Sequence, residues 1–314
     1  MFHPIAHAVI SRCFALLVML AGAACMAVLT GPPASAQGKP PASAADLASP
    51  AGVAREGYTL TPAAAEALEA TLTTNPNDLA ARTKLLGFYF RQGGRAVARD
   101  AAIETRRRHI LWLIENRPAS AVFDLSETTI DKAGHGLADP VGFAQVAAAW
   151  TEQAKRESGN ARVLGNAARF FLLSDKERAA AFLRQAQQAE PDNPQWRARI
   201  GQVLALAVLG VDMMNQNGLP TSHNSAEARN AFALRTIDEL TRSTDAIVVG
   251  TAGTLIGQQG LMMSAMYGDK FAVDHIALSD ALLARARELE PQNPNWPNVV
   301  EQLRSLRAMR DQRK

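Results

Sequence analysis

The strongest constraint on the fold is a seven-residue stretch that occurs twice, as EPDNPQW at 190–196 and as EPQNPNW at 290–296. A proline cannot continue a helix, because it lacks the backbone N–H and its ring clashes with the preceding turn. Asparagine is a favoured N-cap, and proline is a favoured first helical residue. Each stretch therefore predicts a helix end and a helix start separated by a two-residue turn, with a tryptophan in the first turn of the new helix. Asn75-Pro76 is a fainter third instance.

Most of the remaining chain shows helical spacing of apolar residues and little strand-type alternation. Short, rigid turns between helices place consecutive helices antiparallel. We therefore predict an all-α protein of stacked antiparallel helical hairpins. A short Ala-rich helix is expected to open at Thr61-Pro62. Further helices are expected near 78–91, 95–116, 140–157, 160–173, 175–189, 194–211, 225–242, 244–267, 270–289 and 294–312.

Residues 1–36 have the form of a secretory signal peptide. A start with one Arg and no acidic residue is followed by the apolar run FALLVMLAGAACMAVL and by small residues that end at Ala36. We expect cleavage after Ala36 and a periplasmic or secreted protein; the alternative is an uncleaved segment that anchors the chain in a membrane. Residues 37–60 are rich in Ala, Pro, Ser and Gly, which predicts a flexible linker. Residues 61–314 form the predicted helical domain.

Composition excludes several classes of function. Both cysteines, Cys13 and Cys25, lie in the predicted signal peptide. The mature chain is therefore expected to have no disulfide, thiol nucleophile or zinc–thiolate site. No two of its histidines have metal-ligand spacing and no phosphate loop is present, so we expect no metal and no cofactor. The formal charge of +3 is spread evenly and forms no basic stripe for a nucleic-acid partner.

Two segments invite a functional interpretation that we do not favour. Residues 246–267 carry no charge, but Gln258, Gln259 and four glycines favour a buried helix over a membrane span, so no integral membrane domain is expected. Arg106-Arg107-Arg108-His109 has the composition of an anion-binding patch. Consecutive residues point in different directions around a helix, however, so we expect a solvated helix face instead.

A longer internal repeat surrounds the two turns. Small, large and small residues followed by a proline recur at the same spacing 100 residues apart, and a further match follows Asn160. Small residues let two helices approach closely, large ones fill the space between them, and the proline ends the pair. The matched positions are Ala179, Leu183, Ala186 and Pro191 with Ser279, Leu283, Ala286 and Pro291, and also Ala167, Phe170, Ile200, Gly201 and Leu204.

This pattern resembles the tetratricopeptide repeat (TPR), a helix–turn–helix unit of about 34 residues. The resemblance covers roughly half of the mature chain and implies an irregular, TPR-like α-solenoid. It departs from the family pattern because the 100 residues between the two turns, from 191 to 291, contain only four predicted helices. That number suggests two enlarged hairpins where the family would place three regular ones.

The resemblance implies a scaffold that binds a protein or peptide partner and has no catalysis of its own. In TPR proteins the first helix of each hairpin lines a concave groove. Carried onto this sequence, that face selects Lys84, Phe88 and Arg91 on the first hairpin and Gln195 and Gln202 after Pro194. Two cations beside an aromatic ring could hold an acidic or C-terminal peptide.

The resemblance assigns the same groove-lining face to the hairpin that starts at Asn160. There it selects Leu164, Phe171 and Leu172, which we expect to be covered by neighbouring helices.

A helical secreted enzyme, such as a hydrolase acting on cell-wall or carbohydrate material, is the alternative. Such an enzyme needs a pair of carboxylates in a cleft. The irregular segment 118–138 supplies the only candidates, Asp124, Glu127 and Asp131. If these acids converge in a pocket the alternative gains support, and if they are scattered it loses it.

Overall fold

The computed structural model describes residues 49–93, 95–133, 137–211, 226–267 and 273–312. These residues form twelve α-helices, two short 3-10 helices and no strand, so the all-α prediction is confirmed. The predicted signal peptide, 1–36, lies outside the described residues. The α-helices are α3 (Pro50–Gly57), α4 (Pro62–Thr74), α5 (Leu79–Gln92), α6 (Arg99–Asn116), α7 (Pro140–Arg156), α8 (Ala161–Phe171), α9 (Lys176–Ala189), α10 (Pro194–Val208), α11 (Ala226–Arg242), α12 (Ala246–Tyr267), α13 (His275–Leu289) and α14 (Asn295–Asp311).

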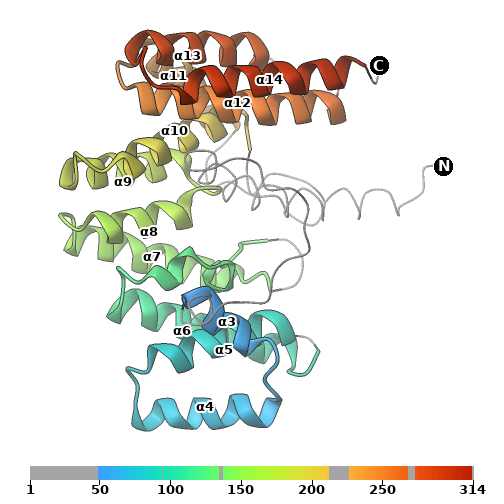
Figure 1. Cartoon of the computed structure of the whole chain (residues 1–314). Helices are drawn as coiled ribbons and strands as arrows, with labels where there is room; N and C mark the ends of the chain where they lie inside the picture. The colour runs from blue at the N-terminus through green and yellow to red at the C-terminus, as the bar shows by residue number, and fades with distance from the viewer. Residues whose placement is uncertain (1–48, 94, 134–136, 212–225, 268–272, 313–314) are drawn as a thin grey trace.

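The helices stack in one column, with α4 at one end and α13 and α14 at the other (Figure 1). Helices that follow one another in sequence are mostly neighbours in space: α8 packs on α9, α9 on α10 and α12 on α13. The loop between α6 and α7 carries the two 3-10 helices, η1 (Ala121–Asp124) and η2 (Ser126–Thr128). They contact α3 and α5, so this loop lies along the side of the stack.

Four turns in the stack share one form, and this form explains the repeated sequence. Each turn runs from a helix C-cap to the N-cap three residues later, and the N-cap N–H donates to the C-cap carbonyl at 2.9–3.2 Å. In three of them an asparagine N-cap also donates from Nδ2 to a glutamate C-cap, at 2.8 or 2.9 Å. The turns are Asn75–Asp78, Glu157–Asn160, Glu190–Asn193 and Glu290–Asn293.

The contacts between the two caps, more than the prolines, define this turn. The turn that starts at Glu157 has Ser158 and Gly159 in its centre and no proline, yet it makes the same contacts. The turn that starts at Asn75 also differs from its prediction. Its Pro76 corresponds to Pro191 and not to Pro194, and Asp78 is the N-cap of α5. Proline only reinforces a break that the capping contacts already specify.

Each tryptophan that follows a turn packs into a notch made by a glycine. Trp196 and Trp296 are buried, with 2 % and 4 % of their surfaces exposed. A Cβ built on Gly165 of α8 would lie 2.4 Å from the Trp196 ring, and one on Gly250 of α12 would lie 2.4 Å from the Trp296 ring. The predicted tryptophan in the first turn of each new helix is confirmed, and the notches show which helix receives each ring.

The uncharged helix α12 is buried between α10, α13 and α14 (Figure 1). Its glycines face neighbouring helices: a Cβ on Gly253 would meet Leu282, and one on Gly257 would meet Ser279. This close packing is the reason for its many small residues. No helix among the described residues is long and apolar enough to cross a membrane.

The N-terminal linker prediction is wrong over Pro50–Gly57, which form α3. Ser49 caps this helix by accepting from the Gly52 N–H at 3.1 Å. The helix crosses α5 at very short range, since a Cβ on Gly57 would lie 1.9 Å from the Lys84 carbonyl oxygen. The small residues that look like a linker in the sequence are the ones that this close crossing requires.

Candidate binding face

Residues at fixed positions after the N-cap lie on one side of each of three helices, α5, α8 and α10. A helix turns once every 3.6 residues, so positions two, six and nine after the cap lie on one side. The N-caps are Asp78 for α5, Asn160 for α8 and Asn193 for α10. We call these positions the inner stripe; they are Ala80, Lys84 and Gly87 on α5, Arg162, Asn166 and Arg169 on α8, and Gln195, Arg199 and Gln202 on α10.

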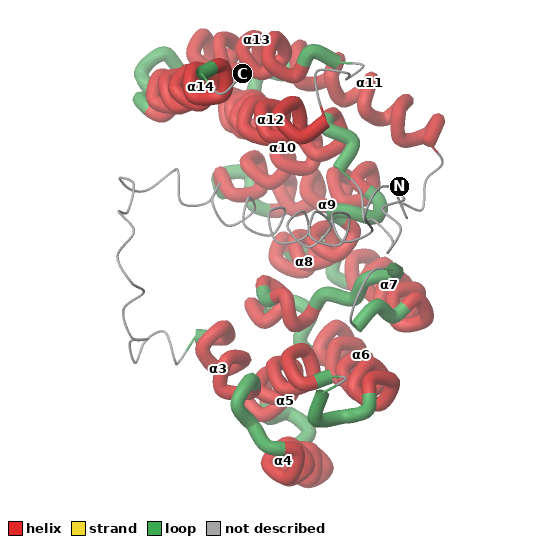
Figure 2. Tube along the Cα trace, turned by 90° about the vertical axis from the view of Figure 1, so that its right-hand side faces the viewer, coloured by secondary structure: helices red, strands yellow, loops and turns green. Residues whose placement is uncertain are grey.

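On α5 the stripe is covered by α3 of the same chain. Lys84 Nζ lies 2.6 Å from Glu56 Oε2, and both side chains keep partial exposure. A Cβ on Gly87 would lie 2.0 Å from the Ala54 carbonyl oxygen. In Figure 2, α3 and α6 flank α5 on opposite sides. The predicted groove cation Lys84 therefore already contacts an acidic residue, and that residue belongs to the protein itself.

The other groove residues predicted on α5 have different positions. Phe88 is 1 % exposed and packs in a core cluster with Leu85 and Tyr89. Phe88 is ten residues after the cap, one beyond the stripe, and is turned into the core, so it presents no surface to a partner. Arg91 is exposed near the end of the helix.

Both glutamines predicted on α10 lie on the inner stripe. Gln195 and Gln202 are half-buried and flank Arg199 along the same side of the helix. Their amides can donate and accept, which suits the main-chain groups of a peptide.

Three arginines contact one aspartate, Asp124, where α8 and α10 meet the η1 loop. Arg162 Nη2 bonds to Asp124 Oδ2, and Arg199 Nη2 lies 3.7 Å from Asp124 Oδ1. Arg169 donates from Nη2 to the main-chain oxygen of Asp124 at 2.9 Å. We call Arg162, Arg169 and Arg199 the arginine cluster. All three are on the inner stripe.

The arginine cluster has more positive charge than its acidic partner balances. Burial lowers the pKa of Arg199, and Arg169 and Arg162 lower it further, while Asp124 acts in the opposite direction. Burial also lowers the pKa of Arg169. Arginine nevertheless stays protonated. Three guanidinium ions thus contact one aspartate, and Arg169 Nε and Arg199 Nη1 are buried without a hydrogen-bond partner.

Two local features hold the cluster in place. Arg199 Nη1 would lie 3.1 Å from a Cβ on Gly165, so the bare backbone at that position makes room for the guanidinium as well as for the Trp196 ring. Asn166, between the two arginines of α8, donates to the carbonyls of Pro118 at 2.8 Å and Ser120 at 3.2 Å. These bonds hold Pro118 and Ser120, which precede η1, against α8.

The three acids of segment 118–138 do not form one site. Asp124 faces the arginine cluster. Glu127 is buried, accepts from the Tyr58 hydroxyl and from Ser126 Oγ, and lies within electrostatic range of Arg106. Asp131 interacts electrostatically with Arg106 but is exposed at the surface. Glu127 and Asp131 both lie within electrostatic range of Arg106, and no described contact joins Asp124 to either of them.

The basic run that starts at Arg106 is a set of separate structural contacts. Arg106 donates to main-chain oxygens of the η2 region, and Arg107 pairs with Asp139 at 2.7 Å. His109 is buried and lies 2.8 Å from Glu69 through Nε2. These neighbours in sequence point to different parts of the fold, as their helical spacing predicts. The expected solvated helix face is wrong for Arg106 and His109, which are buried.

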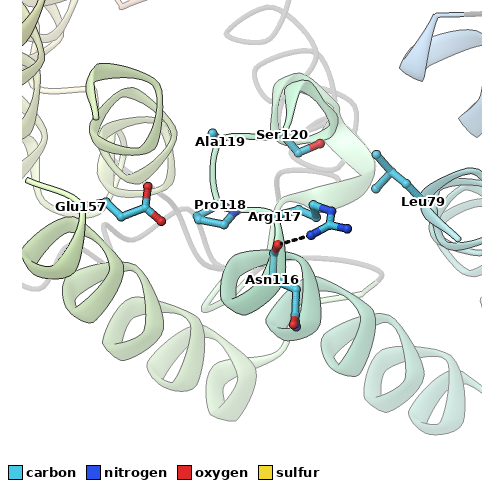
Figure 3. Close-up of a pocket in the computed structure, with 7 residues that line it drawn as sticks. All are labelled: Leu79, Asn116, Arg117, Pro118, Ala119, Ser120 and Glu157. Atoms are coloured by element: carbon cyan, nitrogen blue, oxygen red, sulfur yellow. Dashed lines mark hydrogen bonds between the residues drawn. The ribbon is translucent and has the colours of Figure 1, made fainter. Parts of the chain in front are cut away.

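A shallow hollow lies on the edge of the stack that carries the turns (Figure 3). Its floor is the segment Asn116–Ser120, with Leu79 on one side and Glu157 on the other. Arg117 Nη1 donates to the Asn116 carbonyl at 2.9 Å, and Glu157 accepts from Asn160. Its two charged groups are thus engaged in local contacts and do not converge on a common point.

Sequence reasoning missed the arginine cluster because it placed the face of α8 in the wrong register. Leu164 and Phe171 are buried, and they lie four and eleven residues after the cap. The positions selected on α10, two and nine after the cap, correspond on α8 to Arg162 and Arg169. Counting from each N-cap would have found both arginines.

Comparisons with known proteins add no relative. No known family model matches the chain, and no curated protein matches it. Within the described residues no group of His, Cys, Asp and Glu side chains could hold a metal ion. The interpretation of the inner stripe therefore depends on its own geometry.

Proposed function

We propose that this chain is a TPR-like scaffold that binds a protein or peptide partner along the inner stripe and performs no catalysis of its own. One observation carries the proposal: at two levels of the stack the stripe already holds an acidic residue of the protein's own polypeptide. Glu56 of α3 pairs with Lys84, and Asp124 of η1 pairs with the arginine cluster. A surface that binds acidic polypeptide within the chain is chemically suited to bind it from a partner.

The stacked architecture supports the same proposal. Helices packed side by side present one long surface to which each helix contributes a few side chains. Charged and amide groups at corresponding positions of α5, α8 and α10 form such a row. With a signal peptide cleaved after Ala36, the scaffold would work in the periplasm or outside the cell.

The test is capture of partners from the cell-envelope fraction by the purified protein, expressed with its own N-terminal segment. We expect the double variant Lys84→Ala/Arg91→Ala, or Arg162→Ala/Arg199→Ala, to lose a partner that the wild type retains. The matched control is Arg235→Ala/Arg242→Ala, which removes two exposed arginines of α11, a helix without stripe positions. Equal recovery of every partner by all variants would refute the stripe as the binding surface.

The predicted export has an independent readout. Intact mass of the mature protein is expected to correspond to a chain that begins at Gln37. A mass that includes residues 1–36 would instead favour the membrane-anchored alternative.

A further inference from the structure

The contacts of Asp124 resemble those of a bound ligand. Its carboxylate meets two arginines from different helices, and its main-chain carbonyl accepts from a third. The arginine cluster thus contacts both the side chain and the backbone of Asp124. Asp124 keeps a side-chain exposure of 41 %, so solvent reaches this position.

Asp124 does not satisfy all the hydrogen-bond donors of the arginine cluster. Arg199 Nη2 lies 3.7 Å from the carboxylate, beyond ordinary hydrogen-bond range. Arg169 reaches only the main-chain oxygen, and its Nε has no hydrogen-bond partner. A buried donor without a partner is unfavourable, and so are like charges held close together. A ligand carboxylate that came closer to Arg199 and to these unpartnered donors than Asp124 does would reduce both costs.

We propose that the arginine cluster is a binding site for an aspartate-containing acidic peptide, and that Asp124 is an internal competitor for this site. The ligand's aspartate carboxylate would replace that of Asp124 on Arg162 and Arg199, while its main-chain carbonyl would accept from Arg169. This inference rests on the proposed scaffold function and names the chemistry of its ligand.

Asp124 itself is the reason to choose a peptide over a free anion. An inorganic anion would take only the carboxylate position, whereas the donor of Arg169 points to a backbone carbonyl. Gln195 and Gln202 continue the stripe on either side of Arg199, where the next residues of an extended peptide would pass. Their amide groups match peptide N–H and C=O groups.

The test is a fluorescence-anisotropy titration with a labelled peptide, Gly-Ala-Asp-Asp-Ala-Gly, amidated at its C-terminus. Asp124→Asn removes the competing carboxylate and is expected to tighten binding of the peptide about tenfold. The peptide carboxylate can then pair with Arg162 and Arg199 without displacing that of Asp124. Arg199→Gln is expected to weaken binding at least about tenfold. Arg235→Gln on α11 is the matched control and should bind like the wild type.

Additional arms identify the chemistry of the ligand. The same peptide with Asn in place of both Asp residues should bind weakly to every variant. A peptide with a free C-terminus tests whether a terminal carboxylate serves as well, and inorganic phosphate tests whether any anion competes. Complete displacement of the peptide by phosphate at equal ionic strength would show a simple anion site and overturn the peptide assignment.

The results separate this inference from the proposed function. If Asp124→Asn binds the Asp peptide no more tightly than wild type, while circular dichroism shows an unchanged helical fold, Asp124 is not a competitor. If peptides bind but Arg199→Gln and Arg162→Gln leave binding unchanged, the arginine cluster is not the site and the scaffold function survives. If the stripe variants also retain every envelope partner, the scaffold function itself fails.

Discussion

The two turns that repeat in sequence, at Glu190–Trp196 and at Glu290–Trp296, show which parts of the repeated stretch have a structural role. Both use a glutamate C-cap, an asparagine N-cap and a tryptophan seated on a glycine. They differ at the indole nitrogen: Trp196 Nε1 donates to Glu190 Oε2 at 2.8 Å, whereas Trp296 Nε1 is buried and has no partner. The ring in its glycine notch is therefore the shared element, and the indole hydrogen bond is local to the first turn.

Truncating the tryptophans should have the largest effect on this comparison. We expect Trp196→Ala and Trp296→Ala each to reduce the free energy of unfolding by about 3–5 kcal/mol, because a large buried ring is replaced by a cavity. Chemical denaturation followed by circular dichroism measures both. The effect at Trp196 should be the larger, since it belongs to the main core and also loses a hydrogen bond. A loss of less than 1 kcal/mol at either site would contradict the notch as the common element.

Filling the notches should have the next largest effect. Gly165→Ala and Gly250→Ala each place a Cβ 2.4 Å from a tryptophan ring carbon. The resulting overpacking is expected to reduce the free energy of unfolding by about 1–3 kcal/mol. Gly159→Ala is the control, because a Cβ there would meet nothing within 4 Å. If all three variants have the same stability, the glycines are not required by the ring.

Removing only the indole N–H should separate the two turns. Trp196→Phe loses the bond to Glu190, whereas Trp296→Phe removes a buried donor without a partner. After allowance for the smaller ring in both variants, we expect Trp196→Phe to be more destabilising by about 1 kcal/mol in thermal or chemical denaturation. An equal loss at both positions would show that the hydrogen bond contributes nothing at the first turn.

The smallest expected effect depends on pH. Hydrogen bonds from Asn193 and Trp196 lower the pKa of Glu190 below its ordinary value of 4.5. A lowered folded-state pKa means that the contribution is present above pH 4.5 and is lost as the pH falls through the folded-state pKa. Glu190→Gln should therefore be less stable than wild type at pH 7 and approach it in acid. A stability difference that stays constant from pH 7 to pH 3 would contradict this origin.

Much of the fold follows from local signals in the sequence, because caps and prolines act over a few residues. The turns at Asn193 and Asn293 were predicted from their prolines and asparagine caps, of which the caps matter more, and the burial of α12 was predicted from its glycines. Helix α3 was missed because Gly52 and Gly57 weaken its own helical signal; its packing on α5 at Gly57 and Gly87 stabilises it. Long-range packing of this kind leaves no local pattern.

The candidate site was predicted only in part, for a similar reason. Lys84, Gln195 and Gln202 lie on the inner stripe, but Phe88 lies in the core. The arginine cluster depends on Asp124, which comes from a loop 38 residues before Arg162. No spacing rule connects that loop to α8 and α10. The arginines themselves could have been found by counting residues from each N-cap, but their partner Asp124 could not.

The most direct test of the inner stripe as a docking surface is photo-crosslinking with the Asp peptide carrying a benzophenone group at one end. The account predicts adducts on α8 and α10 near the arginine cluster, with higher yield in Asp124→Asn and much lower yield in Arg199→Gln. Adducts confined to α9, α11 and α13, with yields that do not change between these variants, would contradict it.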